Sequence, residues 1–186
     1  MGHHQEHGSH EGTGHGDAAS GHHAHDVTEV GFGILTVSSS RTLQDDPTGD
    51  ALVAAVEDAG MDVEARTLVP DDVAPIRATV EDMVGSADVD LVVTSGGTGL
   101  TPDDVTLQAV DPLFTRQIPG FGELFRFLSY DDIGARALLT RASAGLADDV
   151  PVFCMPGSRA GATMGLEELI LPTARHVVGL TRRDEA

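Results

Sequence analysis

The stretch from Leu91 to Asp104 constrains the fold more than any other part of this 186-residue chain. Residues 91–93 form a short, continuous apolar run, which is typical of a strand buried on both faces of a parallel sheet. Three glycines within four residues follow, and then two carboxylates, Asp103 and Asp104. Such glycines allow a backbone to bind a phosphate closely, and a carboxylate beside a phosphate usually implies Mg²⁺ between them. The alternative is a loop whose glycines serve only the turn, since it matches neither familiar phosphate fingerprint.

The order of the other apolar segments predicts an α/β fold. Strands are expected over residues 33–37, 61–69 and 89–94, with helices between them, which favours a right-handed parallel sheet. Later strands are expected over residues 138–146 and 150–155, joined by an acidic turn. The expected helices cover residues 50–59, 72–84, 106–114, a segment after residue 123, and a C-terminal segment interrupted at Pro172.

Polar residues follow several of these predicted strands. Ser38, Ser40 and Arg41 come after the first strand, and Asp71 comes after the second. Open α/β sheets bind ligands at this edge, so these side chains are candidates for contact with a polar or anionic ligand. The alternatives are a loop rich in turn-forming residues for 38–41, and a helix N-cap for Asp71 or Asp72.

Residues 1–26 read as a disordered tail, and residues 27–186 as one folded domain. The tail holds eight of the nine histidines and almost nothing apolar, so it cannot bury enough surface to offset its ordering entropy. Irregularly spaced imidazoles can bind Zn²⁺, Ni²⁺ or Cu²⁺ without forming a compact site. A solvated tail, adventitious metal binding and a metal-delivery role therefore remain open. The remaining histidine, His176, lies near the C-terminal end of a predicted helix, so we expect it to have a structural role or to face the helix dipole.

The amino-acid composition limits the binding partners and the cellular compartment that are expected for this protein. With 30 acidic residues against 11 basic ones, the formal charge is −19, and all the basic residues are arginine. This pattern is typical of adaptation to concentrated salt, and it disfavours nucleic acid or an anionic membrane as partners. Cys154 is the only cysteine and lies in an apolar run, so it is expected to be a small buried hydrophobe. Because no apolar run reaches the length of a membrane span and no secretory pattern is present, a cytoplasmic protein is expected.

Three stretches together resemble the MoaB/MogA family of molybdenum cofactor biosynthesis, and more closely its MoaB subgroup. They are TSGGTGLTPDDVT at residues 94–106, IPGFGELFR at residues 118–126 and MPGS at residues 155–158. The resemblance begins near residue 30 and continues to the C-terminus. It implies a three-layer α/β/α sandwich around a mostly parallel sheet, assembled as a homotrimer or homohexamer. It also implies Mg²⁺-dependent transfer of AMP from ATP to molybdopterin, with release of pyrophosphate.

The resemblance further implies roles for individual residues. Asp71 and Asp104 match the two carboxylates of active members, where they position Mg²⁺ for catalysis. The residues that this resemblance assigns to binding of the pterin and the nucleotide are Ser38, Ser40, Arg41, Ser95, Gly96, Gly97, Thr98, Gly99, Gly120, Glu123, Pro156, Gly157 and Ser158.

Two features depart from the family pattern. Asp103 occupies a position where relatives often carry arginine, and the loop after residue 155 lacks a lysine, although Arg159 is nearby. The alternative function is therefore a non-catalytic molybdopterin-binding or scaffold protein of the same pathway. Other proteins of molybdenum cofactor biosynthesis are further expected partners.

Overall fold

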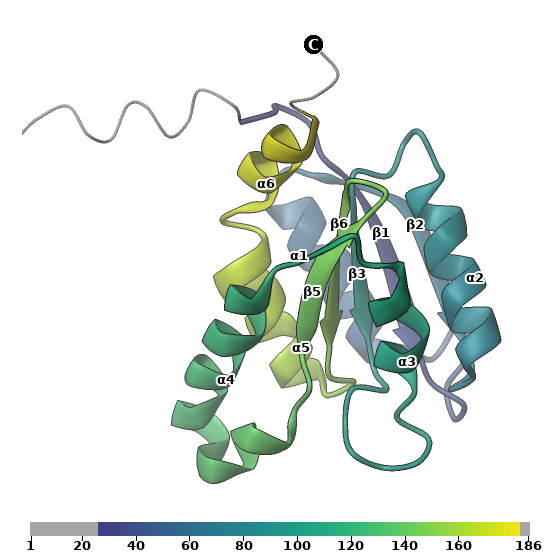
Figure 1. The fold of residues 1–186 in the computed structure, drawn as a ribbon, viewed down its shortest axis with the longest axis vertical. Coiled ribbons are helices and arrows are strands. Elements are labelled where there is room, and N and C mark those ends of the chain that lie inside the picture. The colour runs from purple at the N-terminus through teal and green to yellow at the C-terminus, as the bar shows by residue number, and fades with distance from the viewer. Residues whose placement is uncertain (1–25, 183–186) are drawn as a thin grey trace, which may run out of the picture.

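A six-stranded sheet forms the centre of the computed structural model, which describes residues 26–182 (Figure 1). The strands are β1 (Gly31–Val37), β2 (Asp62–Val69), β3 (Leu91–Ser95), β4 (Arg116–Gln117), β5 (Ser143–Ala147) and β6 (Val150–Met155). Their order in the sheet is β2-β1-β3-β6-β5-β4. The first four strands of this order pair in parallel, and β5 and β4 add an antiparallel edge. The prediction of a mostly parallel sheet is confirmed.

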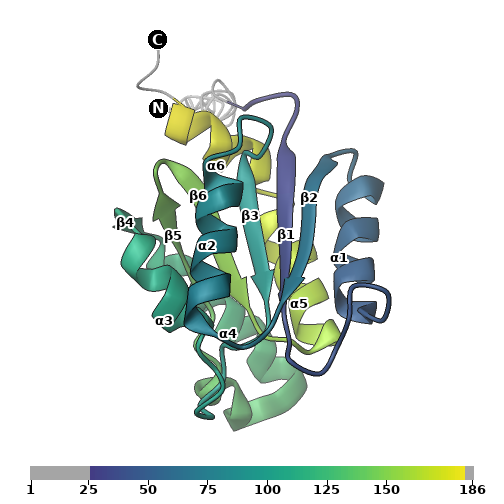
Figure 2. The ribbon, with the colours of Figure 1, turned by 90° about the vertical axis from the view of Figure 1, so that its right-hand side faces the viewer.

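Helices cover both faces of this sheet. One layer contains α1 (Pro47–Asp58), α4 (Pro119–Ile133), α5 (Arg159–Gly165) and α6 (Ala174–Thr181). The opposite layer contains α2 (Val73–Val84) and α3 (Thr106–Val110), which lie side by side (Figures 1 and 2). The structure therefore confirms the three-layer α/β/α arrangement.

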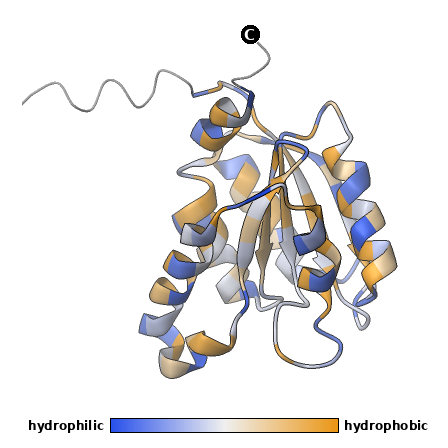
Figure 3. Cartoon of the chain, in the orientation of Figure 1, coloured by the Kyte–Doolittle hydropathy of each residue, from blue (hydrophilic) through white to orange (hydrophobic). Residues whose placement is uncertain are grey.

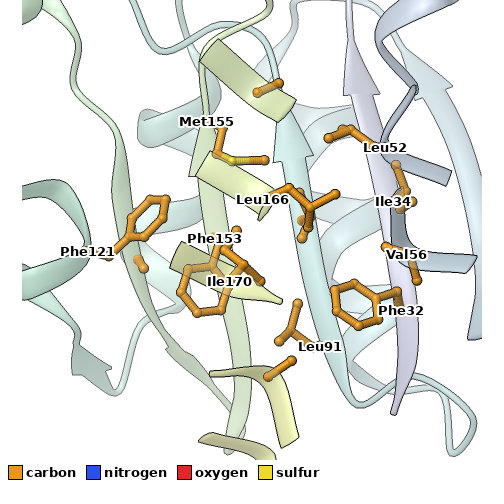
Figure 4. Packing of buried hydrophobic residues seen from close by; sticks show 14 of the residues in the cluster. Phe32, Ile34, Leu52, Val56, Leu91, Phe121, Phe153, Met155, Leu166 and Ile170 are labelled. Atoms are coloured by element: carbon orange, nitrogen blue, oxygen red, sulfur yellow. The ribbon is translucent and has the colours of Figure 1, made fainter. Parts of the chain in front are cut away.

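The alternation of side chains along β1 divides the core into its two halves. Phe32 and Ile34 point to the α1 face, whereas Leu35 and Val37 point to the α2 face. All four are buried, because the strand lies inside the sheet with a helical layer on either side. Figure 4 shows Phe32 and Ile34 packed with Leu166 on the α1 face.

Capping residues fix the points at which two loops at the sheet edge end and the helices α1 and α2 begin. Asp46 caps α1 by accepting the Gly49 N–H at 3.0 Å, and Asp72 caps α2 by accepting the Ala74 N–H at 3.2 Å. At the C-terminal end, α5 continues as a π-helical turn, Leu166–Ile170, and α6 starts after Pro172. The predicted interruption at Pro172 is confirmed.

The strand predicted over residues 138–146 is wrong in its first half. Residues Gly134–Leu139 form a 3₁₀ helix (η2), and β5 begins only at Ser143. Leu138 and Leu139 are 80% and 56% exposed, so their apolar character belongs to the surface and not to a buried strand. The two-residue strand β4 was not predicted, because an exposed pair of residues carries no periodic pattern.

Two single residues behave as predicted. Cys154 is fully buried, and burial raises the pKa of its thiol to about 12, so it is an inert hydrophobe. His176 lies on α6 with its Nδ1 atom 2.8 Å from Asp26 Oδ1, which is a structural contact.

The predictions for the histidine-rich tail fall almost entirely on residues 1–25, which lie outside the described residues. Within residues 26–182, no helix is both long enough and apolar enough to cross a membrane.

Truncating the core of the α1 face should destabilise the fold strongly. Leu166 is fully buried, so Leu166→Ala is expected to lower the free energy of unfolding by about 3–5 kcal/mol, through lost burial and the cavity left behind. Leu180→Ala is the matched control, because Leu180 is 42% exposed; it should cost at most about 0.5 kcal/mol. Urea unfolding measures both, and equal losses would contradict this description of the core.

Candidate functional site

Four loops meet at the edge of the sheet where the parallel strands end. Gly96 donates its N–H to the Met155 carbonyl at 3.0 Å, and Ser38 donates its N–H to the Val69 carbonyl at 2.9 Å. Figure 2 shows β1 and β3 running toward this same edge, and Figure 1 shows the long loop after β3 at the end of the sheet opposite α6. The edge brings together the predicted site segments at residues 38–41, 71, 95–104 and 156–158.

Ser39 joins the loop after β1 to the loop after β2. Its N–H donates to Asp71 Oδ2 at 2.6 Å, and the Asp71 N–H donates to Ser39 Oγ at 3.0 Å. Because Asp72 caps α2, Asp71 does not serve as the helix cap. Ser38 and Ser40 lie beside this pair with their hydroxyl oxygens 3.4 Å apart. The sequence alone did not single out Ser39, because its role depends on a residue 32 positions away.

The glycine loop is held in a conformation that only glycine adopts easily. Gly96 and Gly97 have φ angles of +109° and +65°, in the left-handed half of backbone space. A Cβ atom on Gly97 would lie 2.3 Å from Thr106 Oγ1. That hydroxyl donates to the Gly96 carbonyl at 2.8 Å, and the Thr106 N–H donates to the Gly97 carbonyl at 3.0 Å. The loop is therefore fastened to the first residue of α3.

Two buried hydroxyls in this loop lack a protein partner within the described part of the chain. Ser95 is fully buried and Thr98 is 1% exposed, yet neither side-chain oxygen has a hydrogen-bond partner. An unpaired buried polar group costs about 1–3 kcal/mol, so such groups need an explanation such as a ligand or an ordered water. Both residues belong to the predicted site, and their unused hydrogen-bonding capacity fits a polar ligand at this loop.

Asp104 is held by the residues of its own turn. Its Oδ2 atom accepts the Thr101 N–H at 2.8 Å and the Thr101 hydroxyl at 2.6 Å. Burial by itself raises the pKa of Asp104, but these hydrogen bonds, one from the Gly99 backbone and the charge of Arg141 together lower it below its usual value of 3.8. Asp104 is therefore ionised at neutral pH, as a metal-binding or charge-stabilising carboxylate must be.

Arg141 is a site residue that the sequence did not reveal. Its backbone N–H donates to the Thr98 carbonyl at 3.1 Å, and its side-chain Nη2 atom donates to the Asp104 backbone carbonyl at 2.7 Å. It thus spans the glycine loop and adds a positive charge there. Asp103, its acidic neighbour in this loop, is exposed. No local pattern pointed to Arg141, because it follows the 3₁₀ segment that was read as part of a strand.

Arg41 lies between the loop after β1 and the loop after β6. Its Nη1 atom donates to Thr48 Oγ1 at 3.1 Å, and that hydroxyl donates to the Gly157 carbonyl at 3.4 Å. A Cβ atom on Gly157 would lie 3.2 Å from Gly96 Cα, so the two glycine turns pack against each other. Asp46, a buried carboxylate 3.9 Å from Arg41, was also not recognised from the sequence.

Pro156 and Ser158 line a cavity of about 550 Å³ between α4 and α5. Its walls are mostly apolar and include Phe125, Leu128 and Met164. A concave, mainly apolar site with a few polar groups is the usual form of a pocket for a small organic ligand.

Gly120 and Glu123 lie near the start of α4. Glu123 lines a smaller cavity of about 160 Å³ with Arg126 and Ser143. Gly122 is closely packed, since a Cβ atom there would lie 2.6 Å from the Ala142 carbonyl oxygen. At Gly120 an added Cβ would meet no atom within 4 Å. Neither Gly120 nor Glu123 lines the cavity beside Pro156 and Ser158.

The oxygen donors at this edge suit Mg²⁺ better than a transition metal. Within residues 26–182, no three or more His, Cys, Asp or Glu side chains gather in one group. Mg²⁺ usually binds one or two carboxylates together with substrate phosphates and water, which Asp71 and Asp104 match in kind and number. The hydrogen bonds from Ser39 and Thr101 engage the Oδ2 atom of Asp71 and of Asp104, respectively.

The geometry defines a class of protein: a three-layer α/β/α domain with a glycine loop, two carboxylates and two arginines at the carboxyl edge of its sheet. Residues 33–176 match the family model described as "Probable molybdopterin binding domain". The chain belongs to this family.

Relatives and solved structures agree with this assignment. The chain is 38% identical over 153 residues to molybdenum cofactor biosynthesis protein B of Bacillus subtilis (strain 168), a match that covers 82% of this chain and 90% of the relative. A crystal structure of a molybdenum cofactor biosynthesis protein B has a TM-score of 0.81 and 41% identity, covering 83% of this chain and 97% of that one. The tungsten cofactor synthesizing protein MoaB from Pyrococcus furiosus has a TM-score of 0.76 and 31% identity, with coverages of 84% and 99%. The resemblance to the MoaB/MogA family is confirmed.

Removing the Thr101 hydroxyl should raise the pKa of Asp104. Thr101→Val keeps the shape of the side chain but removes one hydrogen bond to the ionised carboxylate, so the pKa should move up toward 3.8 or beyond. A carbon-detected NMR titration of the Asp104 carboxyl group measures this shift. Thr115→Val is the control, since its hydroxyl donates to the Leu146 carbonyl and should leave Asp104 unchanged.

The same substitution should alter the dependence of stability on pH. Because the folded pKa of Asp104 lies below its usual value, the ionised group stabilises the fold above about pH 4. This contribution is lost as the pH falls through the folded pKa. Thr101→Val should therefore be less stable than the wild type at pH 6, and the difference should shrink at pH 3. A difference that grows on acidification would contradict the assignment.

Proposed function

We propose that this chain acts in molybdenum or tungsten cofactor biosynthesis and transfers AMP from ATP to molybdopterin. The observation that carries the proposal is the meeting of the glycine loop, Asp71 and Asp104 at one sheet edge, within a family of probable molybdopterin-binding domains. The names of the relatives, which refer to molybdenum or tungsten cofactor synthesis, support the pathway. Because ATP is a substrate, the proposal places the reaction in the cytoplasm.

The proposed reaction needs alignment and charge stabilisation, but no covalent intermediate on the protein. A phosphate oxygen of molybdopterin attacks the α-phosphorus of ATP, and the bond from that phosphorus to the bridging oxygen breaks. The products are adenylylated molybdopterin and pyrophosphate, which keeps the electron pair of the broken bond. Holding the two phosphates in line supplies most of the acceleration in reactions of this type.

The glycine loop and two arginines would hold the phosphates. The N–H groups of Gly97 and Thr98 would face the phosphates, because those of Gly96 and Gly99 already donate to Met155 and Asp104. The unpaired hydroxyls of Ser95 and Thr98 would add donors. Arg41 and Arg141 supply the positive charge at this edge, so arginine takes the part of the lysine that the chain lacks. The apolar cavity beside Pro156 and Ser158 is large enough for a flat heterocycle such as the pterin or the adenine.

Asp71 and Asp104 would act at different points of the substrate. They follow β2 and β3, which are separated by β1, so their strands lie about 10 Å apart. Mg²⁺ bound with ATP would offset the negative charge that develops on pyrophosphate. Asp71, held by Ser39, and Asp104, held by Thr101, are the carboxylates that would hold this ion at the sheet edge.

Neighbouring aspartates in the loop provide a matched test of this assignment. Asp104→Asn is expected to lower kcat by about 10²-fold or more, because it removes a preorganised charge. Asp103→Asn, which removes the same charge from an exposed side chain, should leave kcat unchanged or slightly higher. The assay measures pyrophosphate release and adenylylated molybdopterin from ATP, Mg²⁺ and molybdopterin, in salt concentrations that keep the chain folded.

The results separate catalysis from the alternative function. A folded wild type that binds molybdopterin but forms no product would overturn the proposed reaction and favour the non-catalytic binding or scaffold protein. Equal losses for the two aspartate variants would instead remove Asp104 from its assigned role. Asp71→Asn, measured alongside, should resemble Asp104→Asn and not Asp103→Asn.

We also propose that α4 and the 3₁₀ helix η2 form the surface through which the chain assembles into a homotrimer or homohexamer. Six large apolar residues on these two elements are 46–80% exposed: Leu124, Phe127, Tyr130, Ile133, Leu138 and Leu139. Figure 3 shows hydrophobic residues along α4 and the segment that follows it. Exposed apolar patches of this kind usually mark contact surfaces, and other proteins of cofactor biosynthesis are candidate partners for the assembled protein.

Charging this surface should dissociate the assembly. Phe127 is 69% exposed, so Phe127→Glu should not disturb the core, but it should shift the mass measured by light scattering after size-exclusion chromatography to that of a monomer. Leu180→Glu is the control outside the surface and should keep the wild-type mass. An unchanged oligomer for Phe127→Glu would rule out this surface.

A further inference from the structure

Asp46 is a buried carboxylate beside the candidate nucleotide site. It is fully buried, and both of its oxygens accept hydrogen bonds. The Thr36 hydroxyl donates to Oδ2 at 2.7 Å, and the Gly49 N–H donates to Oδ1 at 3.0 Å. These bonds connect the end of β1 to the start of α1, directly below the loop that carries Arg41. A buried charge is costly unless it is paired, so its cationic neighbours decide its role.

The cation that faces Asp46 from the site is Arg41. Its Nη1 atom lies 3.9 Å from Asp46 Oδ1 and donates to Thr48 Oγ1, in the first turn of α1. The N-terminus of a helix carries a partial positive charge, which repels a guanidinium group. The carboxylate of Asp46 offsets that repulsion, and the hydrogen bond to Thr48 adds to the hold on Arg41.

A second arginine contacts Asp46 but has a stronger partner elsewhere. Arg66 Nη2 lies 3.5 Å from Asp46 Oδ2 and 2.7 Å from Asp50 Oδ1. Asp50 thus takes the close ion pair with Arg66. Within residues 26–182, Asp46 is the only carboxylate in an ion pair with Arg41.

The position of Arg41 leaves most of its donors available. A guanidinium group has five N–H donors, and within the described residues Arg41 uses only the bond to Thr48. Thr48 in turn donates to the Gly157 carbonyl, so Arg41 is held between the loop after β1 and the loop after β6. This is the edge at which the glycine loop binds anions in the proposed function.

We propose that Asp46 is a positioning residue that holds Arg41 against the phosphates of a nucleotide. This inference rests on the proposed function, because it assigns Arg41 to the nucleotide. The competing role is that of a helix cap alone. Asparagine caps helices as well as aspartate does, so Asp46→Asn removes the charge while keeping the cap. The substitution therefore separates positioning from capping.

A double-mutant cycle tests whether Asp46 acts through Arg41. Asp46→Asn should weaken ATP binding about 10-fold and raise KM for ATP similarly, while kcat changes less than about 3-fold. Arg41→Gln should weaken binding at least as much. In the Arg41→Gln background, Asp46→Asn should have no further effect, because its only route to the ligand is gone. Calorimetry with ATP, and separately with inorganic pyrophosphate, measures the binding.

The control removes an equal charge from the same helix. Asp50 lies in the first turn of α1, is 64% exposed and pairs with Arg66, so Asp50→Asn should change ATP binding less than about 2-fold. If Asp46→Asn does not fold, Thr48→Val replaces it in the cycle, since Thr48 is the other group that holds Arg41.

Each outcome decides the proposal. Multiplicative effects of Asp46→Asn and Arg41→Gln, or unchanged ATP binding in folded Asp46→Asn, overturn it and leave Asp46 as a cap. A wild type that binds neither ATP nor pyrophosphate overturns the proposed function, and the inference with it. Loss in the single variants without further loss in the double variant supports it.

Discussion

The contact of Gly96 with two neighbouring strands and with the start of α3 is the constraint on which the candidate site depends. Its N–H bonds to Met155 at the end of β6, and its carbonyl accepts the Thr106 hydroxyl. A Cβ atom would lie 2.2 Å from the Val37 carbonyl at the end of β1, and the φ angle of +109° already disfavours other residues. Any side chain here would push β1 and β3 apart at the edge that carries the candidate site. The backbone of this one residue therefore positions the glycine loop, the start of α3 and the loop after β6 relative to one another.

Most of the fold could be predicted because the core signal is local and periodic. Phe32 and Ile34 face one helical layer and Leu35 faces the other, which a central strand of alternating apolar residues encodes directly. The prediction failed where apolar residues are not buried. Leu138 and Leu139 are hydrophobic enough to resemble a strand, but they lie exposed in a 3₁₀ helix, and no sequence pattern distinguishes an exposed apolar surface from a core.

The site could be predicted only where its residues follow strands in the sequence. Asp71 and the glycine loop do so, and the structure brings their loops to one edge. Arg141 and Asp46 carry no such signal, since the first reaches a carbonyl 37 positions earlier and the second is identified by its burial. The cavity that Glu123 lines was equally invisible, because a motif in the sequence does not say which cavity its side chains line.

The proposed binding of phosphates by a chain with a formal charge of −19 poses an electrostatic problem, which the local geometry addresses. At physiological ionic strength the screening length is about 8 Å, so most surface carboxylates act weakly on a ligand at this edge. The charges that matter are those of the edge itself. Arg41 and Arg141 supply two positive charges there, against Asp71, Asp103 and Asp104. The balance remains negative before any phosphate arrives, and the amides of the glycine loop offset it only in part. A divalent cation that enters with ATP would cancel two of the negative charges that the phosphates bring to this edge, which is the physical reason that the proposed reaction includes Mg²⁺ and relies on both arginines.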